Sequence, residues 1–172
     1  MRKVAIAISL LLVFQAAPVF ASDFVRKHIP DAEFVGEGRL TYLFFDVYDA
    51  ALYAPGGDWN EGEPLALSLS YLRDISGKQI ADRSLEEMDR LGMQDKERLN
   101  EWYNDMIRIF PDVDDETNLT GVYTSDGETI FYKNNENIGS VEDPLFGKYF
   151  FDIWLNVDTS APDLRKKLLG QI

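Results

Sequence analysis

The sequence predicts an α+β domain with a mostly antiparallel sheet. Three observations support this fold class. Residues 65–71 alternate large apolar with small side chains, which is the period-2 pattern of a strand with one face on a core. Residues 76–91 and 95–110 carry apolar side chains at helical spacing. Two strand-like segments flank a Ser-Asp-Gly sequence at residues 125–127, which is typical of a hairpin turn.

The first part of the domain is predicted to consist of strands. Residues 32–38 form a short strand or the beginning of one. Residues 40–53 are rich in aromatic residues, Val and Leu, and they are predicted to form one long strand or two. The Pro-Gly-Gly sequence at residues 55–57 ends this segment with a turn, and the alternating strand at 65–71 follows.

The later part alternates between helices and one hairpin. Ser76 and Asp95 are the predicted N-caps of the first two helices, and Pro111 ends the second. The arms of the hairpin are residues 118–124 and 128–133. In all, the sequence predicts four helices, at residues 76–91, 95–110, 144–155 and 163–169.

Composition and charge exclude several classes of function. The 172 residues include 17 Lys and Arg against 30 Asp and Glu, a formal net charge of −13. A nucleic-acid partner is not expected, because a phosphate backbone needs a basic surface. The chain has no Cys, which excludes disulfides, thiol nucleophiles and zinc–cysteine or iron–sulfur sites. Its one His excludes a multi-histidine metal site, so we expect no metal and no cofactor.

The first 21 residues have the pattern of a secretory signal peptide. Two basic residues follow the initiating Met, residues 4–14 are nearly all apolar, and Val19 and Ala21 occupy the −3 and −1 positions of a cut after Ala21. The apolar run is too short for a membrane span of about 20 residues. The sequence therefore predicts a periplasmic or secreted protein, without a membrane span, whose mature domain is residues 22–172.

Few residues form a pattern that suits enzymatic chemistry. His28 is the single candidate for a Ser-His-Asp site, and its place near the predicted mature N-terminus favours a frayed surface residue. The acidic residues at 112–116 cluster as calcium ligands do, but the loop lacks the glycine at its sixth position, which favours a solvated loop. With so many acidic residues, a glycosidase-like carboxylate pair arises readily by chance and carries no prediction.

Three stretches of sequence together resemble one known family. They are residues 36–40 (GEGRL) followed by 43–53 (LFFDVYDAALY), residues 76–79 (SGKQ), and residues 143–146 (DPLF) leading to 153–155 (IWL) and 159–165 (TSAPDLR). In their order and spacing they are similar to the exported bacterial branch of the chalcone isomerase-like proteins. This resemblance implies a large antiparallel sheet covered on one face by helices, an open-faced sandwich, with a ligand cleft between sheet and helices.

The relatives in this family divide into two functions. Plant chalcone isomerases close a chalcone into a flavanone with an Arg, a Thr, a Tyr and an Asn, whereas fatty-acid-binding relatives hold a carboxylate with an Arg and a Tyr. Tyr48 stands at the position of the enzyme's Thr, as in the fatty-acid-binding pattern. Ile80 and Glu87 stand at the positions of its Tyr and Asn, and neither is a neutral polar residue. The resemblance therefore implies a non-catalytic protein rather than a plant-type isomerase.

The arginine of the family pattern is displaced by one residue. The family reads Gly-x-Gly-x-Arg, but here Arg39 directly follows the second glycine and Leu40 occupies the usual arginine position. Because side chains alternate along a strand, Arg39 shares a cavity with Tyr48 only if a bulge or turn lies between them. We expect Arg39 and Tyr48 to bind the ligand. Tyr42, which has the parity of Tyr48, and Arg73, which would substitute for a misplaced Arg39, are further candidates.

Three hypotheses for the function follow. The favoured one is an exported, non-catalytic protein that binds a fatty acid or another amphipathic carboxylate, because a buried carboxylate needs a cation and a hydroxyl at the end of an apolar cleft. One alternative is an envelope protein-interaction role without a small ligand, in which aromatics such as Phe146, Tyr149 and Phe150 fill the cleft. The other is an isomerase or lyase acting on a non-flavonoid substrate, which requires a perturbed acid or base such as Glu87.

Overall fold

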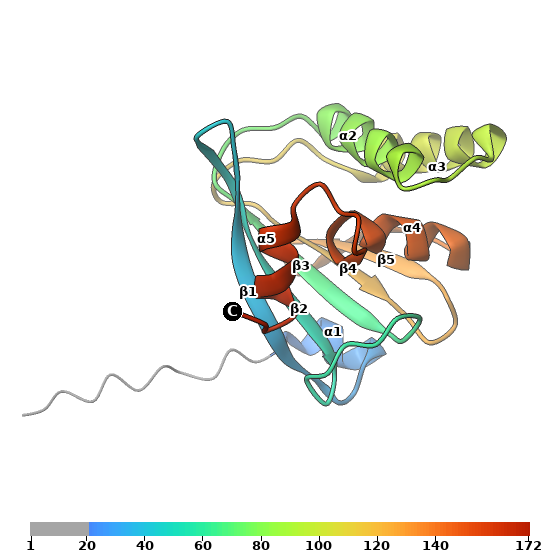
Figure 1. Ribbon diagram of the computed structural model, residues 1–172. Coiled ribbons are helices and arrows are strands. Elements are labelled where there is room, and N and C mark those ends of the chain that lie inside the picture. The colour runs from blue at the N-terminus through green and yellow to red at the C-terminus, as the bar shows by residue number, and fades with distance from the viewer. Residues whose placement is uncertain (1–20) are drawn as a thin grey trace, which may run out of the picture.

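The computed structural model describes residues 21–172, and its centre is one six-stranded sheet (Figure 1). The sheet is antiparallel throughout, and each strand pairs with its neighbours in the sequence. The predicted signal peptide lies, apart from Ala21, outside the described residues. The strands are β1 (Ala32–Tyr42), β2 (Phe45–Pro55), β3 (Leu65–Tyr71), β4 (Asn118–Tyr123), β5 (Thr129–Lys133) and β6 (Glu136–Val141).

Four helices lie on one face of the sheet, and a short fifth helix packs against the other. They are α1 (Asp23–His28), α2 (Gly77–Arg90), α3 (Lys96–Ile109), α4 (Pro144–Leu155) and α5 (Pro162–Leu168). Helix α5 packs across β1, while α2 contacts both α3 and α4. Among the described helices, none is both long enough and apolar enough to cross a membrane.

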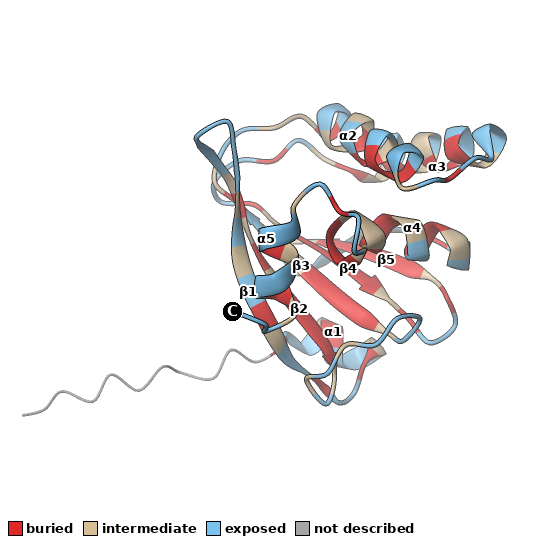
Figure 2. Ribbon diagram, in the orientation of Figure 1, coloured by how far each residue is buried: buried red, intermediate tan, exposed pale blue. Residues whose placement is uncertain are grey.

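The main core lies between the sheet and helices α2 to α5. Along β2, Ala50 and Leu52 belong to this core and are almost fully buried, whereas Tyr53 belongs to a smaller cluster that packs on α1. Figure 2 shows the buried residues along the strands and on the inner sides of the helices. The predicted α+β fold with a helix-covered sheet is confirmed, and α1 adds a partial cover on the second face.

Local sequence signals explain the boundaries of the predicted helices. Ser76 begins α2 with a capping box, in which Gln79 N–H donates to Ser76 Oγ at 3.3 Å and Ser76 N–H donates to Gln79 Oε1 at 3.0 Å. Asp95 caps α3 by accepting a hydrogen bond from the N–H of Arg98 at 3.1 Å. The predicted hairpin turn at residues 125–127 joins β4 to β5.

The segment at residues 40–53 contains a turn that no glycine, proline or asparagine marks. Strand β1 continues to Tyr42, Leu43 and Phe44 form the turn, and β2 begins at Phe45. The φ angles of Leu43 and Phe44 are 46° and 71°, a left-handed conformation that normally selects Gly, Asn or Asp in two-residue hairpins. Of the two alternatives predicted for this segment, one long strand or two, the structure has two, which form one hairpin.

Two further elements differ from the sequence-based expectation. Strand β6 follows a second left-handed turn at Asn134 and Asn135, which are residues suited to it. Helix α1 is packed rather than frayed, since Val25 is 1% exposed and Nε2 of His28 lies 2.8 Å from the hydroxyl of Tyr132. The expectation of a frayed, free His28 is wrong because this turn of helix covers the second sheet face.

Candidate functional site

A cavity of about 960 Å³ lies between the inner face of the sheet and helices α2, α4 and α5; we call it the sheet–helix cavity. Leu67, Leu69 and Phe131 line it from the sheet, and Ile80 and Trp154 line it from α2 and α4. Its volume lies at the upper end of the about 300–1,000 Å³ that ligand sites typically have. An apolar cavity of this size can hold the hydrocarbon part of an amphipathic molecule.

Among the aromatic residues of α4 proposed to fill the cleft, Phe150 lines the cavity, whereas Phe146 and Tyr149 do not. Phe146 and Phe150 stack on each other with ring centroids 5.4 Å apart, and both meet the ring of Phe131 edge to face. Tyr149 instead packs on Trp102 of α3, with ring centroids 6.1 Å apart. A ligand-free role would have these rings fill the cleft, whereas here they pack into their own cluster beside it.

Tyr48 and Tyr71 are two buried tyrosines of the cavity wall, and each has a neutral hydroxyl. Tyr48 accepts a hydrogen bond of 2.8 Å from Nε1 of Trp154, and its ring meets the ring of Tyr71 edge to face at 5.7 Å. Burial raises the pKa of Tyr48 to about 12, although the hydrogen bond from Trp154 opposes this rise, and burial likewise raises the pKa of Tyr71. Both groups therefore remain protonated at neutral pH and can donate a hydrogen bond.

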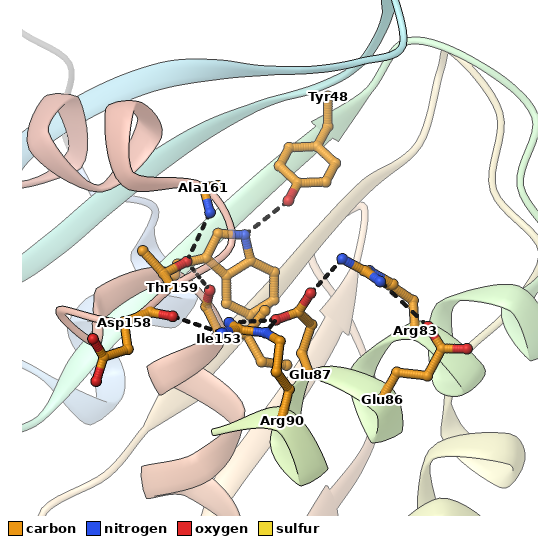
Figure 3. A network of polar contacts seen from close by, with 10 residues as sticks. Tyr48, Arg83, Glu86, Glu87, Arg90, Ile153, Asp158, Thr159 and Ala161 are labelled. Carbon is orange, nitrogen blue, oxygen red and sulfur yellow. Dashed lines mark hydrogen bonds and ion pairs between the residues drawn. The ribbon is translucent and has the colours of Figure 1, made fainter. Parts of the chain in front are cut away.

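Glu87 of α2 lies at the wall of the cavity within a network of ion pairs (Figure 3). Its carboxylate is 2% exposed and pairs with Arg83 and, at 2.7 Å, with Nη2 of Arg90. Arg90 also donates to the carbonyl of Asp158 at 2.8 Å, which ties α2 to the loop between α4 and α5. Two cations thus compensate the buried carboxylate, as burial of a charge requires.

Arg39 and Tyr48 are not brought together. Arg39 lies directly opposite Asp49 in the β1–β2 ladder, and Leu40 lies opposite Tyr48, so the side chains of Arg39 and Tyr48 leave the sheet on opposite faces. Arg39 is still among the residues that line the cavity, and its side chain is 47% exposed. Its guanidinium binds Asp49 through two hydrogen bonds of 2.7 and 2.8 Å and Asp46 through one of 2.9 Å.

A bulge in the hairpin explains why Arg39 has two carboxylate partners. The register shifts by one residue after the Leu40–Tyr48 pair, so that Thr41 lies opposite Asp46. This shift turns Asp46 to the face that Arg39 occupies, and Thr41 Oγ1 donates to Asp46 at 2.7 Å. A bulge is therefore present in this hairpin, which was the condition for Arg39 and Tyr48 to share a cavity. However, it follows the Arg39–Asp49 and Leu40–Tyr48 pairs, so it does not change the face on which Arg39 lies relative to Tyr48.

Arg73 and Tyr42 lie at the mouth of the sheet–helix cavity. The guanidinium carbon of Arg73 lies 5.0 Å from the ring centroid of Phe45, a cation–π contact. Within residues 21–172, no carboxylate forms an ion pair with Arg73, in contrast to Arg39. Tyr42 is 63% exposed at the end of β1, so it belongs to the surface around the mouth rather than to the cavity wall.

Two contributors to the site were not singled out from the sequence, although each had a detectable signal. Tyr71 ends the alternating strand at residues 65–71, and its parity with Leu67 and Leu69 places its side chain on the cavity face. Arg83 precedes Glu87 by four residues on α2, which is the spacing of an ion pair along a helix. Both positions follow from periodicities that the sequence shows.

The acidic loop after α3 serves a structural purpose. Asp112 accepts a hydrogen bond of 2.9 Å from the N–H of Gly77, and Asp114 accepts one of 2.6 Å from the Thr117 hydroxyl. Throughout the described part of the chain, no group of three or more His, Asp or Glu side chains is arranged to hold a metal ion. Hydrogen bonds within the fold therefore account for the carboxylates of Asp112 and Asp114.

Comparisons with known proteins agree with this geometry. The family model described as chalcone isomerase-like matches residues 33–170. A curated protein of Haemophilus influenzae, described as uncharacterized, is 29% identical over 138 residues, which are 80% of this chain and 67% of that protein. The crystal structure of a fatty-acid binding protein from Arabidopsis thaliana superimposes with a TM-score of 0.67 at 13% identity, covering 89% of this chain and 90% of the plant chain. At this identity the similarity concerns the fold.

Proposed function

The chain belongs to the chalcone isomerase-like family, and on this basis we propose that it is a non-catalytic binding protein for a fatty acid or another apolar carboxylate. The sheet–helix cavity carries the proposal, because its volume of about 960 Å³ and its apolar walls suit a hydrocarbon chain. The fatty-acid binding protein of Arabidopsis thaliana shares the fold, which adds support to this class of ligand.

Arg73 is the proposed partner of the ligand carboxylate. It lies at the cavity mouth, and a guanidinium can bind a carboxylate through two parallel hydrogen bonds. Arg39 has its guanidinium occupied by Asp46 and Asp49, so it would have to give up three hydrogen bonds to bind a ligand. In this arrangement the hydrocarbon chain enters the cavity, where Tyr48 and Tyr71 are among the residues that line it.

The same cavity is poorly equipped for catalysis of the chalcone isomerase type. Ile80 lines it where the enzyme pattern has a Tyr, and Glu87 places a carboxylate where the pattern has an Asn. That carboxylate is already bound by Arg83 and Arg90, and it cannot supply the neutral hydrogen-bond donor that the enzyme pattern places there. The raised pKa values of Tyr48 and Tyr71 also keep both hydroxyls from acting as bases at neutral pH.

Displacement of a fluorescent fatty acid tests the proposal. The purified protein should bind dansyl-undecanoic acid with saturation, and palmitate should displace it. Leu69→Trp places a larger side chain in the cavity and should abolish binding, whereas Ile107→Trp adds the same side chain on α3, where Ile107 is 41% exposed, and should leave it unchanged. Binding of equal strength in wild type and a folded Leu69→Trp variant would exclude the sheet–helix cavity as the site.

We also propose that the protein is exported and acts outside the cytoplasm. Support comes from the basic start, the apolar segment at residues 4–14 and the small residues before position 22. The intact mass of the protein recovered from its native host should correspond to residues 22–172. A mass that includes residues 1–21 would contradict export by this route.

A further inference from the structure

Four consecutive apolar residues are exposed at the turn between β1 and β2. Tyr42, Leu43, Phe44 and Phe45 have exposed fractions of 63%, 67%, 97% and 61%. The turn is the loop at the upper left of Figure 1, and Figure 2 shows it as exposed. We call these four residues the hairpin tip. Exposed apolar side chains that gather in this way mark interaction sites, unlike apolar residues scattered singly over a surface.

Folding does not explain the residues at the hairpin tip. Leu43 and Phe44 adopt left-handed φ angles, which are unfavourable for side chains of this kind. The turn between β5 and β6 has the same two left-handed angles but carries Asn134 and Asn135, which tolerate them. Because the chain uses asparagine for this geometry at one hairpin, the Leu and Phe at the other indicate a role in binding.

The hairpin tip is continuous with the mouth of the sheet–helix cavity. Tyr42 belongs both to the tip and to the lining of the cavity. Arg73, also at the mouth, lies over the ring of Phe45 at 5.0 Å. A molecule that enters or leaves the cavity at this mouth therefore passes beside exposed apolar side chains.

We propose that the hairpin tip inserts into the interfacial layer of a zwitterionic lipid bilayer and so places the cavity mouth at the membrane surface. The tip is a narrow protrusion of four residues, whereas a stable protein partner requires about 800 Å² from each side. A bilayer accepts such a protrusion without a matching shape, and Tyr, Phe and Arg are suited to its interface. Membrane docking by the hairpin tip is a separate function from ligand binding in the cavity, because a variant can lose one and keep the other.

The charge of the chain selects the kind of bilayer. The formal net charge is −13; Asp46 and Asp49 closely follow the hairpin tip in the sequence, and Asp74 adjoins Arg73, which contacts Phe45. Arg39 neutralises part of this charge by pairing with Asp46 and Asp49. Anionic lipids would still be repelled by the molecule as a whole, so apolar insertion into neutral headgroups is the favoured mode.

Flotation with phosphatidylcholine vesicles tests the proposal. The wild-type protein should float with the vesicles, and the double variant Leu43→Asn/Phe44→Gly should bind at least about tenfold more weakly, because it removes two apolar side chains that would enter the lipid. The same variant should melt at a higher temperature, since Asn-Gly suits the left-handed turn. Val157→Asn is the control, because Val157 is a 74% exposed apolar residue in the loop between α4 and α5, outside the hairpin tip, and its replacement should leave flotation unchanged.

A spectroscopic reading separates insertion from other forms of association. Phe44→Trp keeps an apolar tip, and its emission should shift to the blue when phosphatidylcholine vesicles are added. The proposal is overturned if wild type fails to float, if Leu43→Asn/Phe44→Gly floats equally well, or if sedimentation shows that the tip mediates a dimer of this chain instead. Binding confined to phosphatidylglycerol vesicles would overturn the charge argument. Dansyl-undecanoic acid binding without vesicles should be unchanged by the double variant, which distinguishes failure of docking from failure of the proposed function.

Discussion

Replacing Arg73 by Ala should weaken the binding of a fatty acid and leave the binding of the corresponding alcohol unchanged. The reason is that Arg73 contributes a charge at the cavity mouth, while the apolar walls that hold the chain remain. Arg39→Ala is the matched control, because its guanidinium is occupied by Asp46 and Asp49. This pair of variants distinguishes the contribution of Arg73 to ligand binding from that of Arg39, since both arginines line the same cavity.

The magnitude follows from the exposure of Arg73. Loss of one partner from a buried charge pair costs about 2–5 kcal/mol, whereas mobile surface pairs contribute about 0.2–1 kcal/mol. Arg73 is exposed, but it stands on the ring of Phe45, which restricts its motion and excludes water from one side. We therefore expect a loss of about 1–2 kcal/mol for palmitate, which is roughly 5–30-fold in Kd.

Competition against dansyl-undecanoic acid measures both ligands with one probe. Palmitate should lose affinity in Arg73→Ala, hexadecanol should not, and Arg73→Lys should recover only part of the loss because Lys lacks the two-point geometry of the guanidinium. Added salt should weaken palmitate binding to wild type. The reasoning is refuted if Arg39→Ala weakens palmitate as much as Arg73→Ala does, or if hexadecanol loses affinity equally.

Three further predictions concern the cavity wall. Tyr48→Phe should lower the free energy of unfolding by about 1–3 kcal/mol in urea titrations, because Nε1 of Trp154 loses its acceptor; Tyr71→Phe, which removes a hydroxyl without such a partner among residues 21–172, should change it much less. The contribution of neutral Tyr48 to stability should be fully present below about pH 10 and be lost between pH 10 and about 12, because the unfolded state ionises tyrosine near pH 10 while burial holds the pKa of Tyr48 near 12; a urea midpoint that is unchanged from pH 10 to 12 would contradict this. Naringenin chalcone should cyclise no faster with the protein than without it, since Ile80 and Glu87 replace polar neutral groups; saturable turnover by absorbance would disprove it.

The sequence was most informative where a residue's role is local. Ser76 and Asp95 cap their helices through side chains that reach only three residues along the chain. The parity of residues 65–71 likewise places Leu67, Leu69 and Tyr71 on one face. Such features depend on backbone geometry alone, so a single sequence contains the information needed to predict them.

The sequence was least informative at the β1–β2 hairpin. A turn is normally recognised by Gly, Asn, Asp or Pro, and Leu43 and Phe44 carry none of these signals. The bulge after the Leu40–Tyr48 pair has no sequence signal either, because it depends on how the two strands pair and not on the residues of one strand. For this reason the sequence could not predict on which face of the sheet Arg39 lies; it predicted only that Arg39 joins Tyr48 if a bulge or turn lies between them. Leu43 and Phe44 are exposed residues that do not suit the conformation of their turn, and departures of this kind are expected at functional sites.

In the proposed site, the one-residue displacement of the arginine moves the cation for the ligand from the cavity wall to the mouth. At the position where the family pattern has the arginine, Leu40 lies opposite Tyr48 and extends the apolar lining. The displaced Arg39 binds Asp46 and Asp49 on the other face, which leaves Arg73 as the cation at the mouth. A carboxylate bound there would lie beside Tyr42 and Phe45, at the bilayer surface that we propose for the hairpin tip. An amphipathic ligand could then exchange between membrane and cavity without carrying its charge through the apolar interior.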